Sequence, residues 1–478
     1  MDKQKIVVYN SLTRKKEEFF PIDDKQIRMY TCGVTVYDDC HIGHARSLYV
    51  FDVIRKYFEY RKFKVNFVRN ITDIDDKIVN RAKQLNVSWE KLSAKYIKRY
   101  QEDLKTLGVS SNHDGVEEEP RATNNIQEMI DFISDLICKG YAYCAENGVY
   151  FRVRKFDKYG ELSGQNTNQM YNNIRIEADT QKEDPLDFAL WKKSKEGEPF
   201  WDSPWGAGRP GWHIECSAMS QKYLRAETLD IHGGGRDLIF PHHENEKAQS
   251  EARTGKSFAN YWIHHGLLTI NGQKMSKSLG NFITIKDFMN KYQDADILKL
   301  FFLSTHYSHS IDYTEVKINE AKKQRKIFNE FFDKVHLRVL KPEGKNNPFS
   351  EKDKTWIDDI CAKFRKAMND NFNTPQALGY LFELIDAGNG FISSDKQDAS
   401  LYVVTKIEEF FSILGLRVKP HITMPQDVEK LICKRDEARK RKDFKQSDEI
   451  RKEIELLGYL VVDTSSTIRL IEKEPDEL

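Results

Sequence analysis

The hydrophobic pattern of the first hundred residues alternates between strand-like and helix-like segments. β-branched and aromatic residues dominate the strand-like segments, whereas Leu48, Phe51 and Phe58 recur at helical spacing. The pattern predicts strand 5–12, strand 26–36, helix 41–61, strand 64–71 and helix 73–85. Thr72 or Asp73 is the expected N-cap of the last helix. Strands that alternate with helices in this way are typical of a parallel sheet in an α/β domain.

This alternation stops near residue 119, where short strands and polar loops begin, and returns near residue 185. The interruption indicates an insertion. Further on, Asn271 and Gly272 lie between apolar flanks and predict a hairpin turn, which leads into the lysine-containing loop 274–281. After about Asp312 the pattern is that of amphipathic helices. Beyond a proline-containing linker we expect one charged helix, followed by residues 458–472.

Length and composition limit the class of protein. A chain of 478 residues is too long for one hydrophobic core and indicates about three domains. The formal net charge is +1, so a nucleic-acid partner would have to bind a local basic patch. No apolar stretch approaches the ~20 residues that span a bilayer, and no signal-peptide pattern is present, so we expect a cytoplasmic protein. The seven cysteines are scattered and contain no CxxC pair, which argues against a disulfide framework.

Candidate metal ligands occur in separate stretches. His242 and Glu246 are four residues apart, so a helix beginning there would place both side chains on one face. His243 competes with His242 for this role. Cys32 and Cys216 border predicted strands or turns of the same α/β unit and could meet at the carboxyl edge of its sheet. These are zinc-ligand residue types, although core cysteines and N-capping histidines would produce the same pattern.

Two short motifs indicate phosphate chemistry. His41 and His44 flank Gly43 where a strand turns into a helix, and the N–H groups and dipole of a helix N-terminus favour phosphate. Lys274 and Lys277 follow the predicted hairpin, and lysines near a polyphosphate neutralise charge that develops in a transition state.

A glycine run in residues 232–238 is a further candidate for nucleotide binding. Its three glycines let the backbone pass close to a ring, and Asp237 could hold ribose hydroxyls. The candidate ATP-binding residues are therefore Gly43, Gly234, Asp237 and Lys277. The P-loop pattern of glycines followed by lysine and serine or threonine is absent from the sequence.

Residues 41–44 (HIGH) and 274–278 (KMSKS) together resemble the double signature of class I aminoacyl-tRNA synthetases. Further stretches resemble one family of that class, the cysteinyl-tRNA synthetases. They are CGVTVYDDCHIGHAR from Cys32, NITDIDDKI from Asn70, DFALWK from Asp187, GWHIECSAM from Gly211 and DIHGGGRDLIFPHHENE from Asp230. The resemblance extends from Val8 to about Asp463.

The resemblance implies an α/β fold: a Rossmann-like parallel-sheet catalytic domain with a short insertion, an all-α helical bundle and a small C-terminal anticodon-binding domain. The expected segments are 1–118 and 185–268 for the catalytic domain, 119–184 for the insertion, 269–314 for the KMSKS loop and stem-contact region, 315–418 for the bundle and 419–478 for the anticodon-binding domain.

The resemblance also implies roles for single residues. The zinc ligands of the family correspond to Cys32, Cys216, His242 and Glu246. The residues that flank the substrate cysteine correspond to Thr72, Trp212 and His213. The residues that act on ATP correspond to His41, His44, Lys274 and Lys277, and Mg²⁺ accompanies the ATP.

The implied reaction is activation of L-cysteine with ATP to cysteinyl-adenylate, followed by transfer to the 3′ end of tRNA(Cys). The shape of a pocket separates near-isosteres such as cysteine and serine only about 10²-fold. Zinc deprotonates a coordinated thiol, which it does not do to a serine hydroxyl at neutral pH. Zinc–thiolate selection would therefore need no editing domain, in agreement with the short insertion.

Residues 434–452 form a basic segment with nine Lys/Arg and five Asp/Glu, a net +4. Such a segment could follow tRNA phosphates, and an aromatic residue within it could stack on an unpaired base, although a solvated, ion-paired helix has the same composition. By resemblance, the anticodon-reading positions are Arg439, Phe444, Asp448 and Asp463. The chain departs from the family after Asp463, where it lacks the usual Gly-Thr pair and tryptophan.

Two alternative functions fit parts of the sequence. An ATP-dependent ligase that joins cysteine to an amino sugar resembles the same catalytic half, but the C-terminal helices and basic tail argue against it. A non-catalytic RNA-binding relative is disfavoured by the intact HIGH and KMSKS motifs. The expected partners are tRNA(Cys), ATP and L-cysteine, with no membrane, and the absence of sustained heptads favours a monomer.

Overall fold

The computed structural model describes residues 5–109, 119–166, 181–276, 279–340, 346–418, 425–441, 443–457, 459–463 and 468–472. The chain divides into two compact units, residues 1–418 and 419–478. Within the described ranges, no helix has the length and apolar character that crossing a membrane requires.

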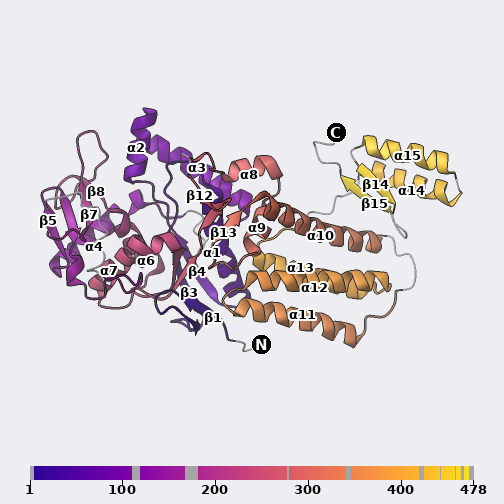
Figure 1. Ribbon diagram of the computed structural model, residues 1–478, viewed down its shortest axis with the longest axis horizontal. Coiled ribbons are helices and arrows are strands. Elements are labelled where there is room, and N and C mark those ends of the chain that lie inside the picture. The colour runs from indigo at the N-terminus through magenta and orange to yellow at the C-terminus, as the bar shows by residue number, and fades with distance from the viewer. Residues whose placement is uncertain are drawn as a thin grey trace. The chain divides into compact units, whose positions relative to one another are not determined.

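The first unit contains a four-stranded parallel sheet in the order β10-β9-β3-β4. Its strands are β3 (Gln26–Thr31), β4 (Lys64–Arg69), β9 (Leu229–Gly235) and β10 (Ala259–His265). α1 (Ile42–Tyr60) connects β3 to β4 and buries most of its length in the largest core cluster. Figure 1 shows β3 and β4 of this sheet next to α1. The prediction of a parallel α/β domain is thereby confirmed.

The start of α2 (Asp76–Leu85), which precedes α3 (Trp89–Leu107), differs from the prediction. Its N-cap is Asp75, whose carboxylate accepts a 2.7 Å hydrogen bond from the Lys77 N–H, so the expected N-cap at Thr72 or Asp73 was wrong. The Thr72 N–H donates to the Val34 carbonyl, and the Asp73 carboxylate accepts from Thr123. Both candidate residues are thus engaged by distant segments, which the local sequence does not reveal.

An antiparallel sheet is inserted between the two halves of the parallel sheet. It has the order β5-β6-β7-β8 and packs with η1 (Ala122–Asn125), α4 (Ile126–Cys138), α6 (Trp212–Leu224) and α7 (Glu244–Thr254). Its strands are β5 (Ala142–Ala145), β6 (Gly148–Phe151), β7 (Phe188–Lys193) and β8 (Gly208–Pro210). The insertion was expected to end at residue 184, but β7 and β8 come after that residue. The sheet therefore contains strands from both sides of the expected boundary.

The predicted hairpin is confirmed at β11 (Leu268–Ile270) and β12 (Gln273–Lys274). Asn271 and Gly272 have φ values of 50° and 75°, the left-handed conformation that this tight turn requires. β13 (Ile311–Tyr313) pairs in parallel with β11, which completes a small three-stranded sheet. α8 (Ile285–Tyr292) and α9 (Ala295–Leu303) lie between β12 and β13 in sequence.

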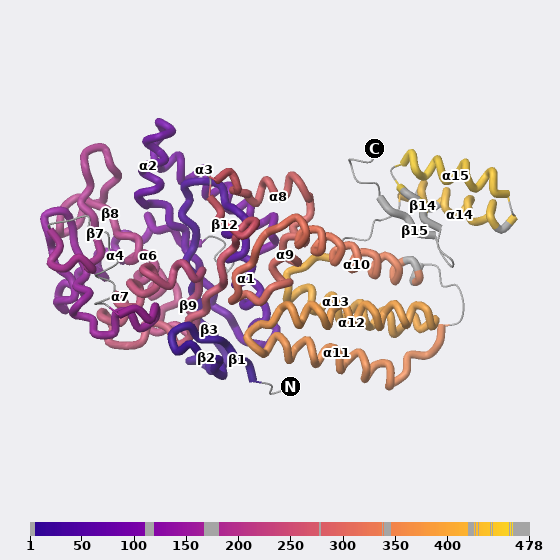
Figure 2. The backbone as a smooth tube through the Cα atoms, viewed as in Figure 1, coloured from indigo at the N-terminus to yellow at the C-terminus, as the bar shows by residue number. Residues whose placement is uncertain are grey.

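Four helices form a bundle in the C-terminal part of the first unit (Figure 2). They are α10 (Glu315–Leu340), α11 (Glu351–Asn369), α12 (Thr374–Ser393) and α13 (Gln397–Leu414). Phe364 of α11 stacks on Phe410 of α13 with 3.8 Å between ring centroids. Because the bundle and α1 share one hydrophobic cluster, the bundle packs against the part of the first unit that contains the parallel sheet.

The second unit contains α14 (Gln426–Lys440), α15 (Phe444–Leu456), β14 (Tyr459–Asp463) and β15 (Ile468–Glu472). The expected single charged helix was wrong, because the segment forms two helices. Asp443 caps the second one by accepting a 3.1 Å hydrogen bond from the Gln446 N–H. A small apolar core that includes Ile432, Ile450 and Val461 holds these elements together.

Candidate active site

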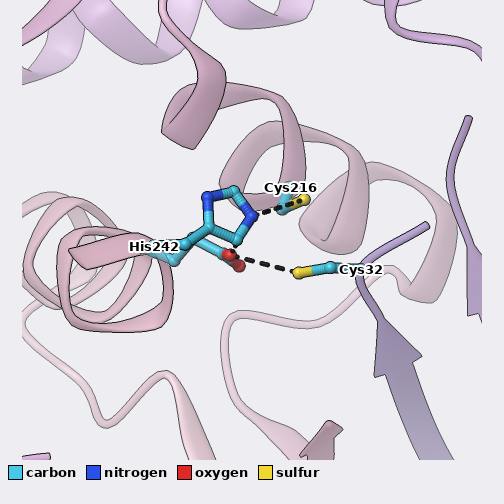
Figure 3. Close-up of side chains that lie close together, drawn as sticks. Cys32, Cys216 and His242 are labelled. Carbon is cyan, nitrogen blue, oxygen red and sulfur yellow. Dashed lines mark hydrogen bonds and ion pairs between the residues drawn. The ribbon is translucent and has the colours of Figure 1, made fainter. Parts of the chain in front are cut away.

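Three elements bring the candidate metal ligands together at the carboxyl edge of the parallel sheet. Cys32 follows β3 directly, His242 precedes α7, and Glu246 lies in the first turn of α7. Cys216 lies inside α6, so the expectation that it borders a strand or turn was wrong. Figure 3 shows both sulfur atoms and the His242 ring turned toward one another.

The ligand atoms of Cys32, Cys216, His242 and Glu246 all lie within 4.8 Å of one another. His242 Nε2 is 2.9 Å from Glu246 Oε1 and 3.7 Å from Cys216 Sγ. Cys32 Sγ is 3.2 Å from Glu246 Oε1. Cys216, His242 and Glu246 are buried, whereas Cys32 is partly exposed. Two thiols, an imidazole and a carboxylate at these separations form a donor set compatible with one metal ion.

A second set of donors overlaps the first. Cys32, His232, His243 and Glu246 also lie within 4.8 Å of one another. His243 Nε2 is 3.3 Å from Cys32 Sγ, and His232 Nε2 is 2.9 Å from Glu246 Oε2. His243 was predicted as a competitor for the ligand position, whereas His232 was not predicted. The available signal was a histidine in the middle of an apolar strand, where a buried polar side chain requires a partner.

Hydrogen bonds and opposite charges within this cluster offset the free-energy cost of burying its ionised groups. Burial raises the pKa of the Cys32 thiol well above its usual value. The pKa of Cys216 is about 7 in spite of burial, because Cys32 and His242 donate hydrogen bonds to its sulfur. Burial also disfavours the charged forms of Glu246 and His242. The attraction between the two charges is larger, so it holds the pKa of Glu246 far below its usual value and raises the pKa of His242 to about 10. A carboxylate is therefore available as a ligand at neutral pH.

Two of the predicted cysteine-pocket residues contact the His242 ring directly. The Trp212 ring stacks on the His242 ring at 4.0 Å, and His213 Nδ1 is 2.8 Å from His242 Nδ1. These two contacts orient the imidazole with its Nε2 toward Cys216 and Glu246. Thr72 Oγ1 donates a 2.8 Å hydrogen bond to Glu215, the residue before Cys216. Glu215 was not predicted, because nothing in the local sequence shows that it is buried.

The HIGH motif forms the first turn of α1. His41 is the N-cap, and its Nδ1 accepts from the His44 N–H at 3.2 Å, while the His41 N–H donates to His44 Nδ1 at 3.4 Å. The two rings stack with 3.7 Å between centroids. Burial and the neighbouring His41 hold the pKa of His44 well below its usual value. The arrangement fixes both imidazoles at a helix N-terminus, where phosphate binding is favoured.

The HIGH and KMSKS segments lie next to each other. The Ile42 N–H donates to the Ile283 carbonyl at 3.1 Å, and the Ile285 N–H donates to the Cys40 carbonyl at 2.9 Å. A Cβ on Gly43 would lie 2.8 Å from the His41 ring and 3.7 Å from the Met275 methyl group. Lys274 is exposed on β12, whereas Lys277 lies outside the described residues.

The glycine run has a role that the sequence only partly indicated. A Cβ on Gly234 would lie 2.8 Å from His243 Cε1, so this glycine allows the His243 ring to approach Cys32. Asp237 is exposed at the end of the run. The structure therefore brings Gly234 to the metal-ligand cluster, and its predicted contact with ATP stays a prediction.

The predicted anticodon residues lie in the second unit. Arg439 is exposed on α14, and Phe444 and Asp448 are exposed on α15, with 62% of Phe444 accessible. Asp463 is the last residue of β14.

Two family models match parts of this chain. Residues 18–323 match the family model of the tRNA synthetase class I (C) catalytic domain, and residues 363–419 match a DALR domain. The fold resembles Mycobacterium tuberculosis methionyl-tRNA synthetase in complex with methionyl-adenylate. The TM-score is 0.66 and the identity 14%, and the match covers 82% of this chain and 91% of that one. Fold, motifs and family model together define a class I tRNA synthetase.

Curated relatives identify one family within the class I tRNA synthetases. The cysteine–tRNA ligase of Thermodesulfovibrio yellowstonii is 48% identical over 486 residues, covering 95% of this chain and 97% of the relative. That of Caldicellulosiruptor saccharolyticus is 45% identical, covering 96% and 97%. The chain belongs to the cysteine–tRNA ligase family.

Proposed function

We propose that this protein activates L-cysteine with ATP to form cysteinyl-adenylate and then transfers the cysteinyl group to the 3′ end of tRNA(Cys). The observation that carries the proposal is the buried cluster of Cys32, Cys216, His242 and Glu246, at the sheet edge from which the HIGH helix also begins. Cys32 precedes the HIGH motif by only nine positions, 32 against 41, so both sites belong to one β–α connection.

The donor set fits zinc in particular. Two sulfur donors favour zinc over magnesium or calcium, which prefer oxygen ligands. The set with Cys216 supplies both sulfur donors, whereas the set with two histidines supplies one. When bound, zinc would supply a Lewis acid that favours a substrate thiolate over a serine hydroxyl. His213 and Trp212 would hold the His242 ring in place. Loss of a contact that orients a metal ligand typically lowers metal affinity by about 10- to 100-fold.

Residues of the chain would contribute the rest of the catalysis by positioning the substrates and by stabilising the charge of the transition state. Thr72, Trp212 and His213 would flank the bound cysteine. His41 and His44 would hold ATP phosphates, with Gly43, Gly234 and Asp237 along the nucleotide and Mg²⁺ accompanying ATP. The substrate carboxylate attacks the α-phosphate and pyrophosphate leaves, while Lys274 and Lys277 stabilise the charge that develops. No enzyme nucleophile is required.

The domain assignment follows the expected segments. Residues 1–118 and 185–268 would form the catalytic domain, 119–184 the insertion, 269–314 the KMSKS and stem-contact region, 315–418 the bundle and 419–478 the anticodon-binding domain. Because the reaction requires ATP and tRNA, we place the protein in the cytoplasm. The sequence has no sustained heptads, which favours a monomer. The near-complete coverage of cysteine–tRNA ligases supports tRNA over an amino sugar as acceptor.

Pyrophosphate exchange with cysteine and with serine, before and after zinc removal, tests the proposal when it is run beside aminoacylation of tRNA(Cys). We expect exchange with cysteine only, loss of exchange on chelation, recovery with added Zn²⁺, and charged tRNA. Exchange without charging would instead indicate a small acceptor. No exchange with any substrate would contradict the enzymatic function.

Removal of an exposed aromatic side chain tests the anticodon assignment. Phe444→Ala should raise the KM for tRNA(Cys) by roughly 5- to 150-fold, because stacking of one base is worth about 1–3 kcal/mol. Pyrophosphate exchange should not change, since the second unit takes no part in adenylation. Leu456→Ala, on the same helix and 84% exposed, is the matched control. Equal effects of the two substitutions on tRNA charging would exclude base stacking by Phe444.

A further inference from the structure

Arg46, two residues after the HIGH motif, is a buried cation with an unusual set of partners. Its side chain is almost fully buried, with 1% exposed. Among the described residues, no carboxylate forms an ion pair with it. Its guanidinium donates hydrogen bonds only to backbone carbonyls. Burial lowers the pKa of Arg46 only to about 10, so the group stays charged at neutral pH, and the four carbonyls must stabilise that charge.

The four carbonyls belong to two separate segments. Nη1 donates to the carbonyls of Gly266 and Leu267, both at 2.8 Å. Nη2 donates to the carbonyl of Tyr307 at 3.2 Å and to that of His309. Arginine suits this role because its planar fork holds several donors in fixed directions, which lysine does not.

Both segments lead into the small sheet that carries the KMSKS loop. β11 begins directly after Leu267, and β13 begins two residues after His309. The segments also contact each other closely. The Gly266 N–H donates to the Tyr307 carbonyl at 2.9 Å, and a Cβ on Gly266 would lie 2.2 Å from the His309 carbonyl group. Arg46 therefore fixes the start of both strands to the helix that holds the HIGH motif.

The same segment is held from the side of the helical bundle. Asn371, in the turn between α11 and α12, accepts hydrogen bonds from the Tyr307 hydroxyl at 2.7 Å and from the Tyr9 N–H at 2.8 Å. Asn371 and Phe372 have φ values of 58° and 53°. Positive φ at a bulky residue such as Phe372 costs free energy and persists only where surrounding contacts impose it.

We infer that Arg46 is a positioning residue for adenylate formation, because it sets the small sheet that carries Lys274 and the KMSKS loop against the HIGH helix. Asn371 supports the same segment from the bundle. The inference rests on the proposed adenylation of cysteine. It concerns the placement of this small sheet and not the metal site, because the four hydrogen bonds of the Arg46 guanidinium go to backbone carbonyls of the segments before β11 and β13.

Steady-state pyrophosphate exchange with the full-length Arg46→Lys and Arg46→Met variants tests the inference. Arg46→Met should lower kcat by about 10²-fold, the loss that roughly 1 Å of misplacement can cause. Arg46→Lys should lower it less, about tenfold, because one or two of the four hydrogen bonds remain. The KM for cysteine and the zinc content should stay within about threefold, because the hydrogen bonds of Arg46 go to neither the metal ligands nor the predicted cysteine-pocket residues.

Arg55 offers a matched control on the same helix. It is also buried, but it pairs with the carboxylates of Asp52 and Glu59 within α1. Arg55→Met should lower the thermal midpoint and leave kcat unchanged. Asn371→Gly is a second test variant, since glycine tolerates the positive φ while the hydrogen bonds to the Tyr307 segment are lost. It should lower kcat with unchanged zinc content.

The outcomes separate the inference from the proposed function. Absence of cysteine-dependent exchange in the unsubstituted protein would contradict the proposed function itself. With that exchange present, kcat within twofold of the parent in Arg46→Lys and Asn371→Gly would overturn the inference, even if Arg46→Met did not fold. Parallel loss of kcat, zinc and thermal stability in the Arg46 and Arg55 variants would also overturn it, because it would indicate a purely structural role.

Discussion

Cys216→Ser is expected to abolish stoichiometric zinc binding and cysteine activation together. Cys216 lies in a buried cluster with an imidazole nitrogen 3.7 Å from its sulfur, and its thiol has a pKa of about 7, so a thiolate forms there readily. A serine hydroxyl stays protonated at neutral pH and is a poor zinc ligand. Since loss of an outer contact alone costs 10–100-fold in affinity or activity, loss of a ligand should lower kcat/KM for cysteine by more than about 10²-fold.

Metal analysis of the purified variant and pyrophosphate exchange measure the two effects. Cys361→Ser is the matched control, because Cys361 is equally buried but lies in the helical bundle, outside the ligand cluster. It should retain zinc and activity and lose only some thermal stability. A Cys216→Ser protein that binds no zinc yet activates cysteine at the parent rate would refute the proposed metal-based selection.

Lys277→Ala is expected to lower kcat for adenylate formation by about 10²- to 10³-fold, the usual effect of removing one group that stabilises transition-state charge. The proposed role of Lys277 is to neutralise charge at the α-phosphate as pyrophosphate leaves. Zinc content and the KM for cysteine should not change, because the proposed cysteine site uses residues of α6, of α7 and of the end of β3.

Single-turnover formation of adenylate is the direct measurement, because it separates chemistry from product release. Lys286→Ala is a suitable control, since Lys286 is an exposed lysine in the first turn of α8, a short distance along the chain. An equal loss in both variants would mean that general positive charge near the site, rather than Lys277 in particular, assists the reaction. A large rise in the KM for cysteine would place Lys277 at the amino acid instead.

Local sequence was sufficient for the features that depend on neighbouring residues. The alternation of strand and helix predicted the parallel sheet, and Asn271-Gly272 predicted the hairpin, because both patterns arise from backbone geometry within a few residues. His242 and Glu246 were predicted to share a face because a helical turn has a fixed period, and their side chains lie 2.9 Å apart. The HIGH and KMSKS motifs indicated the class of synthetase, and five further stretches indicated the family, because each is a short contiguous segment.

Features that depend on distant residues could not be obtained in this way. Asp75 caps α2, because Thr72 is hydrogen-bonded to Val34 and Asp73 is hydrogen-bonded to Thr123. His232 belongs to the second donor set because its strand β9 pairs with β3, and Cys32 follows β3 directly. The charged C-terminal segment divides into two helices because Asp443 caps the second, and the apolar residues of both must reach one small core.

Short motifs and periodic patterns are enough to predict the class of fold, the family and the types of side chain that carry the chemistry, because each depends on residues close together in the chain. Tertiary packing sets which thiol, imidazole and carboxylate atoms lie within 4.8 Å of one another. It also decides that Arg46 binds the carbonyls of two segments that are more than 200 residues away in sequence. Such contacts arise from the packing of sheet, helix and loop, and no local pattern encodes their distances.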